Sequence, residues 1–390
     1  MAAEAVAVEA AVAAEVDRVG LGWRPQIGAG ILANLDRIDL VEVIADDYFN
    51  ASSSKLDSLR VLASHTPFTL HGIGLGMAST TCVDPKRLAK MARLVELLRP
   101  ESWSEHLAFV RAGDIEIGHL ASPPRNAQSL SATLSNLETA RRTVGERPQM
   151  ENIATLIDPP GSTMCEPDWL TGVVKQSDCP LLLDLHNVYT NGVNIGYDPF
   201  AMLDSLPLGQ VGSIHIAGGR WMEERILDDH MHDVPEPVYE LLRFVASRAP
   251  QPLTVILERD GEYPSISSLL QQLDRARAAL EIGRAEAEAE TGKFVRLATQ
   301  SGMEILSTPA FEAVLVRLYS DHEFRQRFID SPAIALAQSG LSGNQCAALA
   351  AIDRKGLILA ARSFAHKKAK PPLSWKVRSL RLLQSIFQCR

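Results

Sequence analysis

The sequence predicts an α/β fold: a closed (β/α)8 barrel of the TIM type, followed by a small all-helical C-terminal domain. Eight short apolar runs, rich in β-branched residues, recur along the first 260 positions, and helical patterns separate them. The alternative is an open doubly wound sheet, which usually carries a glycine-rich phosphate-binding turn after its first strand. Neither GxGxxG nor GxxxxGK[ST] occurs there, so the sequence favours the closed barrel.

The barrel elements follow one another at regular spacing. The helices that the apolar spacing marks most clearly are Pro85–Leu98, Ala127–Val144 and Pro237–Ser247. In a parallel barrel all strands end at the same rim, where catalytic groups gather. The predicted strands are Leu21–Ile27, Leu40–Ala45, Phe68–Gly72, Glu101–Leu107, Pro148–Ile153, Pro180–Leu185, Val211–Ala217 and Leu253–Glu258.

Helix signals also mark the segment that follows the barrel. Thr308 and Pro309 form an N-terminal cap with proline in the first turn, and apolar residues from Phe311 to Tyr319 then recur at helical spacing. Ser342 and Gln345 have the spacing of a capping box, which predicts the start of another helix.

These patterns divide the chain into five parts. We expect a disordered or helical N-terminal extension (residues 1–19), the barrel (20–285), a linker (286–305), a helical bundle (306–366) and a basic amphipathic tail (367–390). The tail holds seven Lys/Arg and no Asp/Glu, so the net charge of −8 is the sum of +7 there and −15 elsewhere. Its apolar residues from Val377 to Phe387 fall on one helical face, which predicts docking on an acidic protein surface ahead of a membrane.

Composition excludes several classes of function. The acidic body lacks the basic face that nucleic-acid binding requires. No run reaches the roughly 18 apolar residues of a membrane span, and the N-terminus lacks a signal-peptide pattern, so we expect a cytoplasmic protein without a membrane partner. The five cysteines are scattered without a CxxC pair, so a metal site here would use nitrogen and oxygen ligands.

Side chains of metal-ligand type stand at or just after the ends of six consecutive predicted strands. Burying such charges without a partner would cost about several kcal/mol each. Metal ions remove that cost, and mixed His and carboxylate ligation suits iron, manganese or zinc. The candidates outnumber the ligands of one ion, which predicts two or three metals. They lie in Leu70–Gly72, Ser104–His106, Met150–Asn152, Asp184–Asn187, Ser213–Ile216, the following loop Asp228–His232, and Leu257–Asp260.

From about Gly20 to Leu280 the sequence resembles the DUF692 family, the multinuclear non-heme iron-dependent oxidases. No single motif is specific, but together they are. The matching motifs are Gly22–Pro25, Val41–Val43, Asp47–Phe49, Leu70–Leu75, Ser104–Leu107, Glu151–Asn152, Gly161–Met164, Leu183–Tyr189, Ile214–Gly218, Asp228–His230 and Leu257–Asp260.

The resemblance implies a barrel that holds two or three iron ions (Fe2+/Fe3+) and uses dioxygen to modify cysteine residues of a ribosomally synthesised precursor peptide. It also implies that a small partner protein presents the peptide. Besides the ligands, His186 and Glu105 are candidates for catalytic roles. The metal ligands implied by the resemblance are His71, His106, Glu151, Asp184, Asn187, His215, Asp228, His230 and Glu258.

Two other functions fit the same residues. A divalent-metal isomerase or hydrolase, similar to sugar isomerases or endonuclease IV, also places His, Asp and Glu at barrel strand ends. The acidic body argues against a nuclease, and dioxygen consumption would separate an oxidase from an isomerase. The third function is a metal-dependent scaffold that binds a peptide without catalysis, which single-turnover assays would distinguish.

Overall fold

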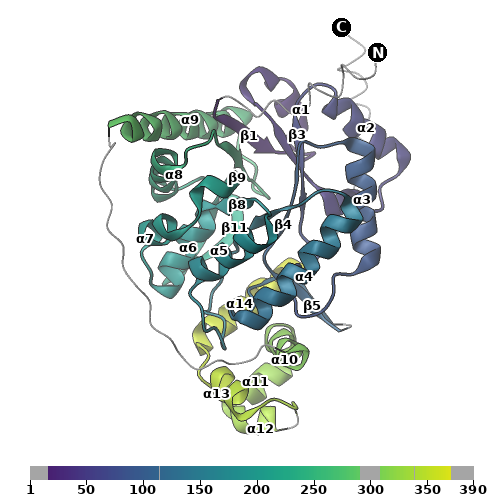
Figure 1. Cartoon of the computed structure of the whole chain (residues 1–390), viewed down its shortest axis with the longest axis vertical. Helices are drawn as coiled ribbons and strands as arrows, with labels where there is room; N and C mark the ends of the chain where they lie inside the picture. Colours follow the sequence, from purple (N-terminus) through teal and green to yellow (C-terminus); the bar gives the residue numbers. More distant parts are fainter. Residues whose placement is uncertain (1–15, 114, 290–307, 338, 370–390) are drawn as a thin grey trace.

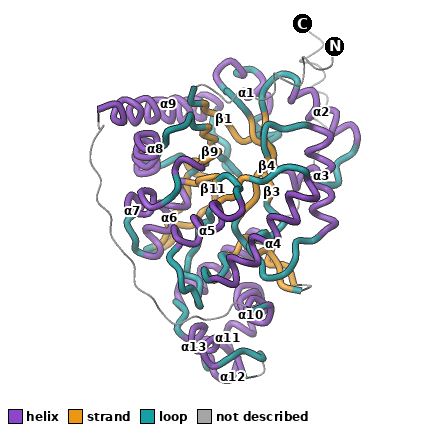
Figure 2. The backbone as a smooth tube through the Cα atoms, in the orientation of Figure 1, coloured by secondary structure: helices purple, strands orange, loops and turns teal. Residues whose placement is uncertain are grey.

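The centre of the molecule is a closed barrel of eight parallel strands, as the sequence predicts. The computed structural model describes residues 16–113, 115–289, 308–337 and 339–369. Figures 1 and 2 show the strands surrounded by helices. In order around the barrel, the strands are β1 (Arg18–Gly22), β2 (Val41–Ile44), β3 (Phe68–Gly72), β4 (Trp103–His106), β7 (Gln149–Glu151), β8 (Leu181–Asp184), β9 (Val211–Ile216) and β12 (Thr254–Leu257).

The first strand begins earlier than predicted. β1 starts at Arg18, inside the predicted N-terminal extension, and ends at Gly22 instead of Ile27. The apolar run continues past the strand, but Pro25 offers no N–H for a ladder and the chain turns there. Asp39 fixes the early start, because its carboxylate accepts a 2.7 Å hydrogen bond from the Val19 N–H.

Helices form the outer layer of the barrel. The predicted helices 85–98 and 127–144 have the expected bounds, and side chains of Asp84 and Asn126 cap their N-termini. The layer consists of α1 (Gly28–Leu32), α2 (Ser53–Ala63), α3 (Pro85–Leu98), α4 (Ala127–Val144), α5 (Glu166–Ser177), α6 (Leu185–Ile195), α7 (Pro199–Ser205), α8 (Glu236–Arg248) and α9 (Ile266–Ala289). Short 3-10 turns lie at Leu35–Arg37, Ala45–Tyr48 and Leu208–Gln210. Among the described residues, no helix combines the length and apolar character needed to cross a membrane.

Two antiparallel hairpins on the C-terminal rim were not predicted. One joins β5 (Phe109–Ala112) to β6 (Ile115–Ala121), and the other joins β10 (Gly218–Met222) to β11 (Arg225–His232). The segment Asp228–His232, predicted as a loop, therefore lies on a strand. The second hairpin turns at Glu223, which adopts a left-handed φ of 57°. Such turns usually contain glycine or asparagine, so its sequence lacks the usual hairpin signal.

The described C-terminal segment is helical, as predicted. The Thr308 side chain caps the first helix, and Ser342 and Gln345 form the predicted capping box. The helices are α10 (Pro309–Ser320), α11 (His322–Asp330), α12 (Pro332–Leu336), α13 (Gly343–Ala350) and α14 (Arg354–Ala369). The predicted linker from residue 290 and the predicted amphipathic tail from residue 370 lie outside the described residues.

The C-terminal helices share one hydrophobic core with the rim of the barrel. Phe109 and Ile117 of the first hairpin pack in the same buried cluster as Phe311, Leu315 and Phe364. Figure 1 shows α10 to α13 at one end of the molecule, with α14 reaching back toward the barrel. The helices are therefore packed on the barrel rim.

A buried carboxylate fastens α10 to the barrel. The Glu312 side chain is fully buried and accepts hydrogen bonds from the Ser79 hydroxyl (3.0 Å) and the Thr80 N–H (2.8 Å). Glu312→Ala would leave both donors without their acceptor, so we expect unfolding free energy to fall by about 1–3 kcal/mol. Urea denaturation measures the loss. The exposed Glu323→Ala is the control, and equal stability of the two variants would contradict the proposed anchor.

Candidate metal centre

The strand register brings ligand-type side chains together at the C-terminal rim. His106 on β4 pairs with Glu151 on β7, and Asp184 on β8 pairs with His215 on β9. Residues paired across parallel strands project to the same face of a sheet, here toward the mouth of the barrel. Asp184 also caps α6, because its Oδ1 atom accepts a 2.6 Å hydrogen bond from the Asn187 N–H. That bond leaves Oδ2 for another partner.

A four-residue group occupies the centre of the mouth. Glu151, Asp184, His215 and Glu258 each offer one ligand atom, and these atoms lie within 4.8 Å of one another. His215 Nδ1 is 3.4 Å from Glu151 Oε1 and 3.1 Å from Glu258 Oε2. All four side chains are buried. One imidazole and three carboxylates are a hard donor set of the kind that divalent iron, manganese or zinc accepts.

A second group shares Glu151 with the first. His71 Nε2 lies 3.4 Å and His106 Nε2 lies 3.1 Å from Glu151 Oε2. His106 Nδ1 donates to the Gly72 carbonyl at 3.0 Å, and His71 Nδ1 is 2.8 Å from the Ser104 hydroxyl. These hydrogen bonds at the Nδ1 atoms fix the ring orientations and turn both Nε2 atoms toward Glu151. Hydrogen-bond partners of metal-bound histidines orient the rings in the same way.

The second hairpin supplies most of a third group. Asp228 and His230 on β11 meet His186 on α6, with Asp228 Oδ1 2.7 Å from His230 Nε2 and 3.0 Å from His186 Nδ1. His230 has a left-handed φ of 52°, and its Nδ1 lies 3.2 Å from Glu258 Oε2. Glu258 therefore connects the third group to the first.

One buried carboxylate at the site was not predicted from the sequence. Glu42 lies in the middle of β2, fully buried, and its Oε2 atom accepts a 3.0 Å hydrogen bond from His215 Nε2. It also forms a potential ligand group with His71 and His215. The available signal was a charged residue inside the apolar run from Leu40 to Ala45, which a purely structural strand would not carry.

Burial and neighbouring charges shift the pKa values of several side chains in the cluster. Burial and the Glu151 charge raise the pKa of Asp184 well above its usual value. Burial opposes protonation of His215, but Glu258, Glu42 and Glu151 together raise its pKa well above normal. Burial likewise opposes protonation of His106, yet Glu151 and Glu105 raise its pKa to about 9. A bound cation would replace the protons that these imidazoles otherwise retain.

Several polar atoms at the centre are buried without a hydrogen-bond partner. Some of them lie within ion-pair distance of a neighbouring side chain, but none makes a hydrogen bond with acceptable geometry among the described residues. Such atoms cost about 1–3 kcal/mol each when they stay unsatisfied. A metal ion would satisfy them, so the residues present fit a metal cluster with nitrogen and oxygen ligands. The atoms are Glu42 Oε1, Glu151 Oε2, Asp184 Oδ2, Asn187 Oδ1, His215 Nδ1 and His230 Nε2.

Two acidic residues near the ligands have other contacts. Glu105, a candidate for a catalytic role, accepts hydrogen bonds from the backbone N–H groups of His106 (2.9 Å) and Leu75 (3.1 Å). It therefore holds the loop after β3 against β4. Asp260 accepts a 2.6 Å hydrogen bond from Arg24 and is half-exposed, so its charge is neutralised without a metal.

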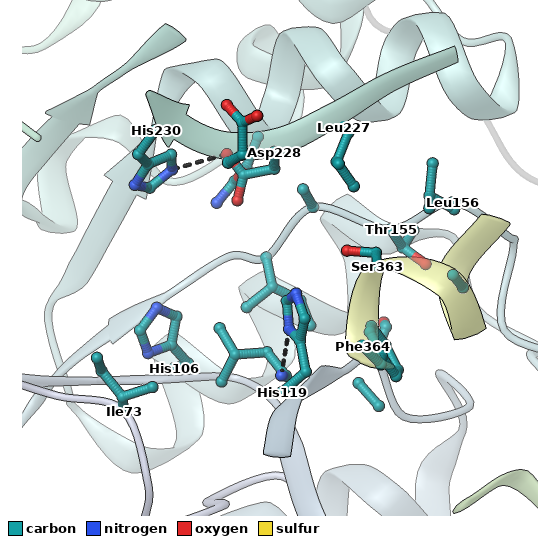
Figure 3. A pocket seen from close by; sticks show the side chains of 18 of the residues that line it. Ile73, His106, His119, Thr155, Leu156, Leu227, Asp228, His230, Ser363 and Phe364 are labelled. Carbon is teal, nitrogen blue, oxygen red and sulfur yellow. Dashed lines mark hydrogen bonds and ion pairs between the residues drawn. The ribbon is translucent and has the colours of Figure 1, made fainter. Parts of the chain in front are cut away.

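A cavity of about 330 Å3 opens above the ligand cluster. His106 and His230 lie at one end of it, and Ser363 and Phe364 of α14 lie on the opposite wall (Figure 3). His71 and Tyr319 of α10 also line the cavity. His119 on β6, which the sequence analysis did not single out, also faces this cavity. Its position depends on a hairpin that the sequence did not reveal.

Comparison with known families identifies the chain. Residues 18–281 match the family described as RiPP precursor modification enzyme MbnB/TglH/ChrH, where RiPP denotes ribosomally synthesised and post-translationally modified peptides. The chain belongs to this family. Its members modify precursor peptides, and the resemblance noted in the sequence is thereby confirmed.

Curated relatives match about two thirds of the chain. A UPF0276 protein of Streptomyces avermitilis is 36% identical over 271 residues, which cover 67% of this chain and 55% of that protein. The chain therefore spans about half the length of this relative. A UPF0276 protein of Caulobacter vibrioides is 31% identical over 274 residues, covering 69% of this chain and 97% of the relative.

Solved structures that resemble part of this chain share little sequence with it. Endonuclease IV from Thermus thermophilus is 18% identical with a TM-score of 0.45, covering 68% of this chain and 99% of that enzyme. An L-ribulose 3-epimerase is 12% identical with a TM-score of 0.46, covering 72% of this chain and all of that enzyme.

Proposed function

We propose that the protein is a multinuclear non-heme iron-dependent oxidase that uses dioxygen to modify cysteine residues of a ribosomally synthesised precursor peptide. The observation that carries the proposal is the position of Glu151. Its two carboxylate oxygens face different ligand groups, Oε2 toward His71 and His106 and Oε1 toward His215. A carboxylate placed between two groups of ligands suits a site with more than one metal ion.

The proposed ligand set extends over three adjoining groups, which is enough for two or three irons. Bound iron would supply the one-electron chemistry with dioxygen that no side chain of this site provides. Glu42 would orient His215 from outside the set. The proposed ligands are His71, His106, Glu151, Asp184, Asn187, His215, Asp228, His230 and Glu258.

The chain itself would bind and orient the peptide. The cavity over the ligands has a volume at the lower end of the roughly 300–1,000 Å3 typical of small-ligand pockets. It therefore suits one or two side chains of a peptide, with the reacting residue at the inner end. The His186 ring, held by Asp228 at 3.0 Å, is placed to steady the third group and remains a candidate catalytic residue.

The genes beside this one are first searched for a short cysteine-containing peptide, which then tests the proposal. The protein, loaded anaerobically with Fe(II), is mixed with a short cysteine-containing peptide from the neighbouring reading frame and exposed to dioxygen. We expect dioxygen consumption and a change in peptide mass that depends on the cysteine. The same peptide with serine in its place is the control. A mass change without dioxygen, or with the serine peptide, would contradict oxidation at cysteine.

A further inference from the structure

The cavity above the metal centre has two chemically different ends. The inner end is formed by imidazoles and carboxylates, including His106, Glu151 and His230. Apolar side chains predominate at the outer end, where Figure 3 places Leu156, Leu227 and Phe364, with the hydroxyl side chains of Thr155 and Ser363 beside them, away from His106 and His230. A single occupant of the whole cavity would therefore need a polar, metal-binding part and an apolar part side by side.

The fused C-terminal helices supply the outer wall. α10 contributes Tyr319, and α14 contributes Ala360, Ser363 and Phe364. None of these four side chains carries a charge at neutral pH, since burial also raises the pKa of Tyr319. A charged group of the occupant would lose its hydration against this wall without gaining a partner from it, which is unfavourable.

Aromatic contacts make the wall a defined surface. The Phe364 ring lies 4.4 Å from the His119 ring of β6, centroid to centroid and tilted by 37°, and it meets the Tyr319 ring edge-on at 5.0 Å. The His119 Nδ1 atom accepts a 2.6 Å hydrogen bond from the Leu120 N–H, which orients this ring beside Phe364. The wall therefore combines residues of the barrel hairpin and of both helices.

The wall is also fixed relative to the ligand cluster. Gly356 at the start of α14 lies so close to the 155–157 loop that a Cβ atom there would come within 2.4 Å of the Leu156 carbonyl oxygen. Arg225 on β11 donates hydrogen bonds both to that carbonyl and to Asp353 beside α14. The strand β11 that carries Asp228 and His230 thus also holds the helix that closes the cavity.

We infer that α10 and α14 form a specificity subsite for an apolar or aromatic side chain of the peptide, adjacent to the residue that reacts at the metal centre. The inference rests on the proposed function for the identity of the occupant. The position of the subsite follows from the cavity alone, because residues of the ligand cluster and of the wall line the same cavity.

Binding to the metal-free, full-length protein tests the subsite. The probes are N-acetyl-Phe-Cys-Phe-amide and N-acetyl-Ser-Cys-Ser-amide, and ligand-observed NMR titration gives their Kd values. We expect the phenylalanine peptide to bind about tenfold or more tightly, because burial of one aromatic side chain produces a preference of that order. Equal Kd values for the wild-type protein would overturn the inference.

Matched substitutions on α14 locate the preference. Ala360 faces the cavity, whereas Ala365 on the same helix is exposed and outside it. Ala360→Trp fills the wall and should bring the ratio of Kd values to near unity, while Ala365→Trp should leave the ratio unchanged. If circular dichroism shows that Ala360→Trp does not fold, Phe364→Leu serves instead and should lower the ratio. Equal ratios for the cavity and exposed variants would overturn the subsite.

These measurements remain separate from the test of the proposed function. The binding preference needs neither iron nor dioxygen, so a protein that fails to oxidise cysteine can still show it. Conversely, oxidation of cysteine by a protein with no preference between the two probes would overturn the subsite and leave the proposed function standing.

Discussion

The Glu151→Ala variant is expected to lose bound metal and peptide modification together. Glu151 is buried at the meeting point of two ligand groups, with three imidazole nitrogens 3.1–3.4 Å from its oxygens. Removing it leaves His71, His106 and His215 without the carboxylate that they share. Loss of an outer partner of a metal ligand costs about 10–100-fold, so removal of a carboxylate that we propose as a ligand should cost more than about 100-fold in activity. Elemental analysis and peptide mass spectrometry measure the two losses.

Asp260→Ala is the matched control for this experiment. Asp260 is an acidic residue of the same cavity, but it is half-exposed and pairs with Arg24. We expect this variant to retain its full metal content. Full metal occupancy in Glu151→Ala, or equal loss in both variants, would show that the proposed ligand assignment is wrong.

The Glu42→Gln variant is expected to weaken metal binding by about 10–100-fold, the range for partners that orient a ligand. Glutamine keeps the size of the side chain but removes the charge that holds the His215 ring through its Nε2 atom at 3.0 Å. The pKa of His215, which Glu258, Glu42 and Glu151 raise against the effect of burial, should fall. Competition with a metal chelator measures the affinity.

A surface glutamate provides the comparison for Glu42. Glu96 on α3 is exposed, and Glu96→Gln makes the same chemical change far from the rim. Its metal affinity should equal that of the wild type. If Glu42→Gln behaves in the same way, the carboxylate has no part in holding His215.

The barrel was predictable because its strands are short apolar runs at regular spacing. All eight were found from the sequence, and helix 127–144 was predicted with its observed bounds. The start of β1 was missed because the hydrogen bond from Val19 to Asp39 joins residues 20 positions apart. The hairpin of β10 and β11 was missed because its turn at Glu223 carries no glycine or asparagine signal.

The part of the candidate site that was predictable consists of polar residues at the ends of apolar strands. His71, His106, Glu151, Asp184 and His215 each stand at or beside a strand end, and the parallel register then brings them together. Glu42 was left out because a buried acid inside a strand has no partner visible in the sequence. The wall of the cavity depends on packing between α14 and the barrel rim, which involves residues more than 200 positions apart.

The metal content of the purified protein tests the central claim most directly. The full chain is loaded anaerobically with Fe(II), separated from unbound metal and analysed for iron, zinc and manganese per chain. The three adjoining ligand groups predict two to three irons per chain. One zinc per chain and no iron would contradict a multinuclear iron centre.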